Sequence, residues 1–349
     1  MGVLGPYPPT RGGLATFSAA LCEGMGACGV DASVVGVEPM GTRVDLLNRG
    51  DVAIIQYDDD SYGGIDGDEV VEIVGAMRVP AIVVVHTIPK KPKRHQRFVL
   101  TSIAATADHL VVMSDIAKQR LCADYGVDRR KVTMIPHGAN VPSGPSQRRP
   151  SRPTILTWGL LRPGKGIERV IDAMGPLTDL PGRPRYLVAG PTHPKVLAAD
   201  GEAYREARAE QARRGGLADS VSLDGRYWNP SMLTALAQSA AVVVLPYDST
   251  DQVTSGVLVD AIASGRPVVA TAFPHAVELL CDGAGIVVDH DDTDALTAAL
   301  HTVLTQPRVA GTMAAEARRL APEMAWPVVA GAYLSLAQRL IAERRVRSH

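Results

Sequence analysis

Short runs of apolar residues alternate along the chain with longer segments whose apolar residues recur at helical spacing. The runs are rich in Val and Ile, and polar residues arrive only at their C-terminal ends, which is typical of strands buried on both faces of a parallel sheet. They cover residues 53–56, 81–85, 110–113, 132–135, 154–157, 186–189, 242–245, 267–270 and 285–288. The segments between them carry helical stripes, such as the one formed by Leu14, Phe17, Leu21 and Met25. This repetition predicts a doubly wound α/β architecture.

The series of strands is interrupted once. Residues 141–153 read VPSGPSQRRPSRP, a composition typical of linkers. We therefore expect two Rossmann-like domains facing each other across a cleft, the first over residues 1–148 and the second over residues 149–325. Residues 326–349 have the pattern of a long amphipathic helix that packs back on one of the domains, and the N-terminal domain is a candidate for its partner.

Composition narrows the class of protein. The 349 residues are 46% hydrophobic but only 4% aromatic, so the cores must consist mainly of Val, Leu, Ile and Ala. A net charge of −1 disfavours nucleic acid as a partner, because nucleic-acid-binding proteins usually carry a basic excess. The four cysteines lack metal-ligand spacing and are expected to be small buried residues of a reducing compartment. No apolar run approaches the roughly 20 residues of a membrane span. We expect a cytoplasmic protein with at most peripheral membrane contact.

Ligands of parallel α/β sheets bind at the carboxyl ends of the strands, so the segments that follow the strands are the candidate sites. Gly12 and Gly13 follow the first short strand. Glycines at a strand-to-helix turn free backbone N–H groups to face an anion, but an ordinary tight turn explains them equally well. Their spacing is not the G-x-G-x-x-G fingerprint, which weighs against an NAD site.

Three further groups follow strands of the first half. Asp58 begins a run of three aspartates that suggests a divalent cation, although a solvated acidic loop is favoured because no further ligand group lies nearby in sequence. His86 either contacts a ligand oxygen or is structural, and the basic residues 90–97 after it are either a solvated face or attract an anionic acceptor or membrane surface. His137 either lines a ligand site or belongs to a hinge turn.

The second half of the chain carries more specific candidates for ligand binding. Arg162 and Lys165 lie on a Gly/Pro loop before a helix, an arrangement that suits a diphosphate. Gly256 offers backbone amides at another helix start, and Asp260 follows one turn later, where an acid holds a ribose diol. Glu278, with His275 before it, lines the same cleft or caps the following helix.

Taken together, these segments resemble the family-4 retaining glycosyltransferases of GT-B fold over essentially the whole chain. The resemblance rests on the order and spacing of PPTRGG, TMIPHGAN, GLLRPGKGIERVIDAM, and SGVLVDAIASGRPVVAT followed by PHAVELL. Two further pieces, IIQYDDDSYGGIDGD and DQVTSGVLVDA, look closest to a mannosyltransferase-like subgroup.

The resemblance implies roles for individual residues. His86 matches the sugar-contacting histidine of the family and Lys165 matches the lysine that grips the diphosphate, whereas Arg162 is displaced by two positions from the family's arginine. Asp260 stands at the second position of the family's paired glutamates. Asp251 is the acid nearest the first position but lies one residue out of register, and Gln252 has the right spacing without the charge.

The expected site therefore has three groups of residues and no metal. The catalytic group is His86, Arg162, Lys165 and Asp251. The donor-binding group is Gly12, Gly13, Arg226, Tyr227, Thr254, Ser255, Gly256, Val257 and Asp260, with the backbone at Arg226 and Tyr227 holding the base. The acceptor- or sugar-contacting group is Arg11, Asp58, His137 and Glu278.

The expected reaction is transfer of a hexose, with retention, from a GDP- or UDP-linked sugar to an unknown glycan, lipid-linked or small-molecule acceptor. GDP-mannose is the preferred donor, and neither a metal nor another cofactor is expected. A GT-B epimerase, a glycoside phosphorylase and a non-catalytic nucleotide-sugar-binding subunit remain as alternatives, the last because the acidic pair is altered. An NAD-dependent dehydrogenase is the weakest alternative.

Overall fold

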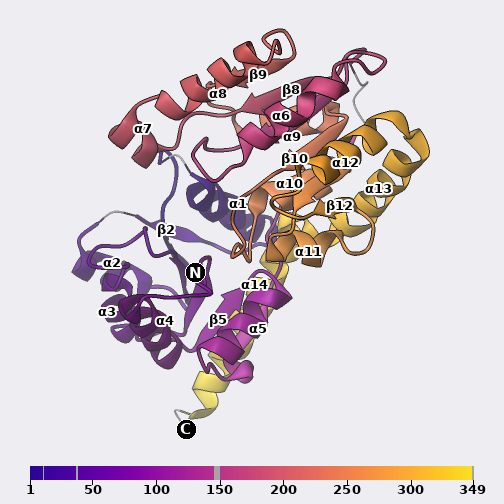
Figure 1. Cartoon of the computed structure of the whole chain (residues 1–349). Coiled ribbons are helices and arrows are strands. Elements are labelled where there is room, and N and C mark those ends of the chain that lie inside the picture. Colours follow the sequence, from indigo (N-terminus) through magenta and orange to yellow (C-terminus); the bar gives the residue numbers. More distant parts are fainter. Residues whose placement is uncertain (11, 37, 145–149, 348–349) are drawn as a thin grey trace. The chain divides into compact units, whose positions relative to one another are not determined.

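The chain divides into two compact units. The computed structural model describes residues 1–10, 12–36, 38–144 and 150–347 (Figure 1). Unit 1 comprises Met1–Gly138, Asp251–Gly256 and Glu323–His349, and unit 2 comprises Ala139–Thr250 and Val257–Pro322. The chain thus crosses from unit 2 into unit 1 for only six residues, 251–256, and then returns.

Unit 1 is built on a six-stranded parallel sheet with the order β2-β1-β3-β4-β5-β6. Its strands are β1 (Gly2–Leu4), β2 (Ser33–Val35), β3 (Ala53–Tyr57), β4 (Ala81–Val85), β5 (His109–Val112) and β6 (Val132–Met134). Its helices are α1 (Gly13–Ala27), α2 (Met40–Leu47), α3 (Glu69–Gly75), α4 (Arg94–Thr106), α5 (Asp115–Asp124) and α14 (Trp326–Arg347), with a 3-10 turn at Arg129–Lys131.

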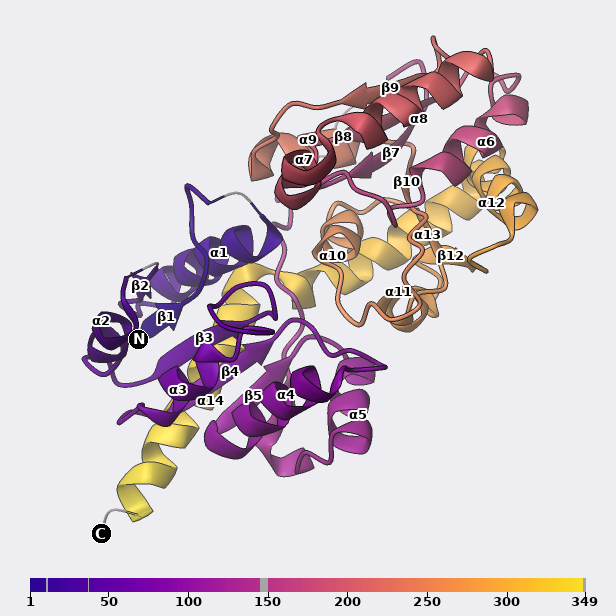
Figure 2. The same ribbon diagram turned by 60° about the vertical axis from the view of Figure 1, so that its left-hand side comes forward.

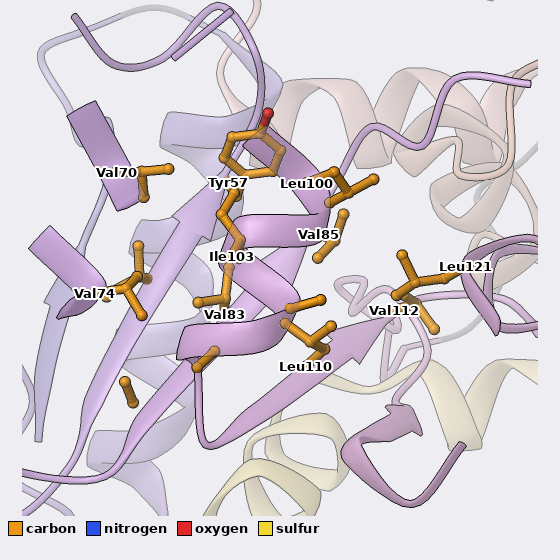
Figure 3. Close-up of a cluster of buried hydrophobic side chains, with 14 of the residues drawn as sticks. Tyr57, Val70, Val74, Val83, Val85, Leu100, Ile103, Leu110, Val112 and Leu121 are labelled. Atoms are coloured by element: carbon orange, nitrogen blue, oxygen red, sulfur yellow. The ribbon is translucent and has the colours of Figure 1, made fainter. Parts of the chain in front are cut away.

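Side chains that alternate along the strands of unit 1 fill two separate cores. Ile55, Val83 and Val85 belong to the core on the face covered by α3, α4 and α5. Figure 3 shows Val83 and Val85 beside helix residues such as Ile103. The residues between them in the strands, such as Ile54, pack with side chains of α1 and α14 in a second core. Figure 2 shows these two helices alongside the sheet of unit 1. The expected stripe on α1 is confirmed for Phe17, Leu21 and Met25, which are all buried.

Helix α14 packs directly on α1. A Cβ atom added to Gly24 of α1 would lie 2.9 Å from the backbone oxygen of Trp326 and 3.1 Å from Cβ of Ala330. The close approach of the two helices therefore requires a residue without a side chain at position 24. Through this contact the C-terminal helix becomes part of unit 1 and covers its sheet.

Unit 2 has a second six-stranded parallel sheet, with the order β12-β11-β10-β7-β8-β9. Its strands are β7 (Thr154–Trp158), β8 (Arg185–Ala189), β9 (Val221–Asp224), β10 (Val242–Leu245), β11 (Val268–Thr271) and β12 (Gly285–Val288). Its helices are α6 (Ile167–Leu177), α7 (Pro194–Asp200), α8 (Ala203–Arg214), α9 (Pro230–Ser239), α10 (Gly256–Ala263), α11 (Pro274–Leu280), α12 (Thr293–Thr305) and α13 (Pro307–Leu320), followed by a 3-10 turn at Ala321–Met324.

The predicted doubly wound α/β architecture is confirmed in both units, and each predicted strand lies within two residues of an observed one. The apolar runs did not cover the three-residue strands β1 and β2, nor β9, an edge strand whose middle residues Ser222 and Leu223 are exposed or only partly buried. The expectation that the cysteines are buried is wrong for Cys28 and Cys281, which are exposed free thiols. No helix in the described part of the chain is both long and apolar enough to cross a membrane.

Replacing Gly24 by alanine tests the contact between α1 and α14. We expect Gly24→Ala to lower the free energy of unfolding by about 1–3 kcal/mol, because the new methyl group overpacks the contact with Trp326. The matched control is Gly26→Ala on the same helix, where the added methyl meets no atom within 4 Å and should raise stability by up to about 1 kcal/mol. Urea unfolding measures both values; equal effects would contradict the packing described.

Candidate functional site

The order of strands in unit 2 reverses between β7 and β10. Connections from β7 run outward on one side of the sheet and those from β10 run outward on the other, so the loops that follow these two strands diverge at one point of the carboxyl edge. Parallel α/β sheets bind their ligands at such switch points. The loop after β7 carries Arg162 and Lys165, and the loop after β10 carries Tyr247.

The two loops are joined by backbone contacts. Gly166 has φ of 63°, and a Cβ atom on it would lie 1.7 Å from the carbonyl oxygen of Pro246. The amide of Asp248 donates to the carbonyl of Gly164 at 3.1 Å, and the guanidinium of Arg169 pairs with the Asp248 carboxylate. Only glycine fits at position 166, because both its backbone angle and the neighbouring carbonyl exclude a side chain.

Lys165 projects from this junction. Its ammonium nitrogen lies 4.0 Å from the centre of the Tyr247 ring, which in turn stacks on Phe273. Within the described residues no carboxylate pairs with the ammonium. Burial, together with the neighbouring charge of Arg162, lowers the pKa of Lys165 from 10.5 to about 8. The site therefore holds a partly desolvated cation whose charge no described carboxylate neutralises.

Two more of the expected residues lie in unit 2 without ion pairs to described residues. Arg162 is exposed on the same loop as Lys165. Asp260 is half-buried on α10, and burial raises the pKa of its carboxyl from 3.8 to about 7. Hydrogen bonds from ligand hydroxyls would stabilise the charged form of this carboxyl group and so lower its pKa again.

The remaining expected residues of unit 2 have structural contacts of their own. The guanidinium of Arg226 pairs with Asp224 at 2.6 Å and lies over the ring of Trp228, and Tyr227 is half exposed. Val257 is half-buried. His275 is buried and Glu278 is half-buried on α11. Their expected donor or acceptor contacts stay predictions.

In unit 1 the expected histidines gather around Phe17. The ring of Phe17 meets His86, His137 and Trp326 edge-on, with ring centres 5.0, 5.0 and 5.2 Å away. Nε2 of His86 lies 2.7 Å from the amide oxygen of Gln56, a fully buried residue of β3. Because an amide oxygen only accepts, His86 donates from Nε2, and its Nδ1 is left as an acceptor.

The electrostatic state of the two histidines is the same. Burial, and to a lesser extent the proximity of His137, lowers the pKa of His86 to about 3. Burial lowers the pKa of His137 to about 4, partly opposed by its hydrogen bond from Nδ1 to the carbonyl of Gly138. Both imidazoles are therefore neutral near pH 7, which suits a hydrogen-bonding role and not that of a general acid.

The acidic loop after β3 folds on itself. Oδ1 of Asp58 accepts from the amide of Asp60 at 3.3 Å, and burial together with a hydrogen bond to Asp59 raises the pKa of Asp58 to about 7. His95 of α4 lies between the carboxylates of Asp66 and Asp68, at 3.1 and 3.4 Å. Among the described residues, no three His, Cys, Asp or Glu side chains are placed to hold a metal ion.

Asp251 is held by contacts with residues of unit 1, and its side chain is 40% exposed. Its carboxylate pairs with the buried guanidinium of Arg120 and accepts from the amide of Lys90 at 2.8 Å, all within unit 1. The catalytic role expected for Asp251 stays a prediction, and its contacts here are those of an anchor. The neighbouring residues Thr254, Ser255 and Gly256 belong to the same short segment of unit 1.

The turn before α1 is only partly described. Gly12 precedes the helix, and neither Gly12 nor Gly13 has an atom within 4 Å of an added Cβ, so both backbones are open on that side. Arg11, expected to face the acceptor or the phosphate, lies outside the described residues.

Three residues of these clusters were not assigned a role from the sequence. Gln56 was detectable, because a polar residue inside the buried run AIIQY requires a partner. Tyr247 and Arg120 were not, since a tyrosine after a strand and an arginine on a helix are common and only the fold brings them to Lys165 and Asp251.

The neutral state of His86 is directly measurable. We expect its imidazole signals in NMR to show no titration between pH 5 and 9, with the proton held on Nε2. Assignment follows from His86→Asn, which removes the signals. A titration midpoint near 6.5 would contradict the burial described and would restore His86 as a candidate proton donor.

Comparisons with known proteins agree with the architecture. Residues 46–141 match the family model described as Glycosyltransferase Family 4, and residues 152–306 match the one described as Glycosyl transferases group 1. A D-inositol 3-phosphate glycosyltransferase from Kineococcus radiotolerans is 28% identical over 271 residues, which are 69% of this chain and 59% of that protein. The match therefore spans less than two thirds of that relative.

Two solved structures show the same fold over nearly the whole chain. A glycosyltransferase from Rickettsia africae superimposes with a TM-score of 0.75 at 14% identity, covering 97% of this chain and 98% of that one. HepE from Anabaena, in complex with UDP and glucose, has a TM-score of 0.76 at 15% identity, covering 97% and 99%. A glycosyltransferase model is thus matched in each half of the chain, and the expected GT-B fold is confirmed.

Proposed function

We propose that this protein transfers a hexose, with retention of configuration, from a nucleotide-sugar donor to an acceptor hydroxyl. The switch point of unit 2 binds the donor diphosphate in this proposal. The observation that carries it is the ammonium of Lys165 beside Tyr247, which no carboxylate of the described residues pairs with, at the edge where a parallel sheet binds its ligands. HepE, which shares the fold, has been solved with UDP and glucose, and this supports a nucleotide sugar as the donor.

The electrostatics of Lys165 suit a leaving group that gains charge. Breaking the bond between the sugar and the diphosphate adds negative charge to the phosphate oxygens. A cation that is already fixed and partly desolvated stabilises that charge more in the transition state than in the ground state, and this lowers the barrier. Arg162 and the N-terminal amides of α6 add to the positive potential on the same loop.

Asp260 completes the donor site as the partner of the ribose. A carboxylate accepts hydrogen bonds from both hydroxyls of a ribose diol, and these bonds would lower the raised pKa of Asp260. The side chain has no ion pair or hydrogen bond to another described residue, so nothing in that part of the chain competes with the ribose.

Retention follows from attack on the same face as the leaving group. The acceptor oxygen bonds to the anomeric carbon as the bond to the diphosphate breaks, and the acceptor proton passes to an oxygen of the departing phosphate. The cationic side chains take the place of a metal ion. His86, fixed by Gln56, orients a sugar hydroxyl as a neutral group.

GDP-mannose remains the preferred donor on the subgroup resemblance, and UDP-sugars are supported by the HepE complex. The acceptor to try first is a phosphorylated polyol, since the relative from Kineococcus is named for inositol 3-phosphate.

A thermal-shift series tests the donor. We expect one of GDP, UDP, ADP and TDP to raise the unfolding temperature more than the others, because only the bound folded state gains free energy. Transfer from the matching sugar nucleotide should continue in excess EDTA. Loss of activity in EDTA that magnesium or manganese restores would overturn the metal-free mechanism. Stabilisation by no nucleotide would overturn the function itself.

The pH dependence of nucleotide affinity tests Lys165. The lysine is charged below its pKa of about 8, so diphosphate affinity should be highest below pH 8 and fall by up to about tenfold per pH unit above it. Lys165→Met should weaken binding at pH 7 by about 10- to 100-fold and flatten this dependence. Lys165→Arg, which keeps its charge at every pH, is the matched control. Calorimetry measures all three proteins, and a wild-type affinity that is constant from pH 7.5 to 9.5 would exclude the lysine from the site.

A further inference from the structure

We propose that Arg120 is a positioning residue for the segment 251–256, which we call the donor turn. The proposal rests on the function proposed above, because the donor turn contains Thr254 and Ser255 and leads into α10, the helix of Asp260. The sequence shows no such role, since Arg120 belongs to an ordinary helical stretch, DIAKQRLCAD, of the first half.

Arg120 makes an unusual set of contacts for an arginine on α5. Its side chain is 7% exposed. Nη1 donates to the carbonyl of Ile88 at 2.8 Å, to the carbonyl of Asp251 at 2.8 Å, and to the carboxylate of Asp251. Moving the Asp251 carboxylate away would leave the buried guanidinium of Arg120 unpaired, which is strongly destabilising. The ion pair therefore holds the donor turn in place.

Two further contacts hold the same segment. Oγ of Ser114, the residue that caps α5, donates to the carbonyl of Val253 at 2.6 Å. The side chain of Val253 is 4% exposed and belongs to the core between the sheet of unit 1 and helices α3 to α5. The donor turn is thus fixed at Asp251 through charge, and at Val253 through a hydrogen bond and apolar packing.

The end of the donor turn is defined as well. A Cβ atom on Gly256 would lie 2.8 Å from Nε2 of His137, so the start of α10 lies directly against this imidazole. Between the two fixed ends, Oγ1 of Thr254 is buried and has no hydrogen-bond partner among the described residues. A buried polar group without a partner costs free energy. A hydrogen bond from this hydroxyl to an oxygen of a bound ligand would remove that cost.

Fixing the turn in advance saves the entropy of ordering it when the donor binds. Ordering one residue costs on the order of 1–2 kcal/mol, so a turn that is already held binds its ligand more tightly than a mobile one. Arg120 would in this way raise donor affinity without touching the donor. The ion pair also gives Asp251 a role. This residue stands near the family's first acidic position, and here its carboxylate anchors the turn by pairing with Arg120.

The experiment compares two buried arginines of unit 1 in the full-length protein. Arg120→Met removes the anchor of the donor turn. Arg43→Met is the matched control, because Arg43 is 16% exposed and pairs with Glu69 at 3.2 Å but contacts no residue of the turn. Asp251→Asn is a milder second variant that keeps the size of the side chain. Hydrogen exchange of peptides covering 251–256 and calorimetric affinity for the nucleoside diphosphate selected by wild type are measured for each.

We expect exchange in the donor turn to rise about tenfold in Arg120→Met, and less in Asp251→Asn, with the affinity for nucleoside diphosphate falling in the same order. Arg120→Lys should restore part of both. Arg43→Met should lower the unfolding temperature without either effect.

Faster exchange with unchanged nucleotide affinity would overturn the positioning role and leave the proposed function standing. Unchanged exchange in both Arg120→Met and Asp251→Asn would overturn the anchor itself. If the wild-type protein binds no nucleoside diphosphate, the proposed function is wrong, and so is the positioning role that rests on it.

Discussion

The approach of Gly166 to the carbonyl of Pro246 is the contact on which the candidate donor site depends. It joins the loops that leave β7 and β10, and any residue with a side chain would separate them. Because the loops meet, the ammonium of Lys165 lies over the ring of Tyr247, out of bulk water and away from carboxylates in the described residues. The lowered pKa of the lysine is therefore a property of the junction and not of the lysine alone.

Unit 1 is organised by a different principle. His86 and His137 are neutral, held by Gln56 and Gly138 and packed around Phe17, so that they offer hydrogen bonds of fixed direction without charge. Of the chain between β10 and α10, residues 251–256 (the donor turn) belong to unit 1. Arg120 pairs with Asp251 of the turn, and Ser114 donates a hydrogen bond to the carbonyl of Val253. Unit 2 thus carries the cation proposed to bind the phosphate, whereas the corresponding cluster of unit 1 is neutral and unit 1 holds the donor turn.

The sequence predicted the two parallel sheets because buried strands of this fold are continuous apolar runs, and those runs were plain from Ala53 to Val288. It failed at β9, where an edge strand is half exposed and its run is short. The sequence suggested Lys165 from a cation on a loop after a buried strand and Asp260 from an acid one turn into a helix, and their site roles stay predictions. It could not predict that Asp251 pairs with Arg120, since the two are 131 residues apart and only tertiary structure joins them.

The pKa of Lys165, measured by NMR on protein labelled in its lysine side chains and assigned with Lys165→Arg, tests this account most directly. The account predicts a pKa near 8 for the free protein, because the ammonium is partly desolvated, lies near Arg162, and has no carboxylate partner among the described residues. It also predicts a rise to above about 10 when a nucleoside diphosphate binds and supplies that charge. A pKa that is near 10.5 in the free protein, or that stays the same on binding, would contradict it.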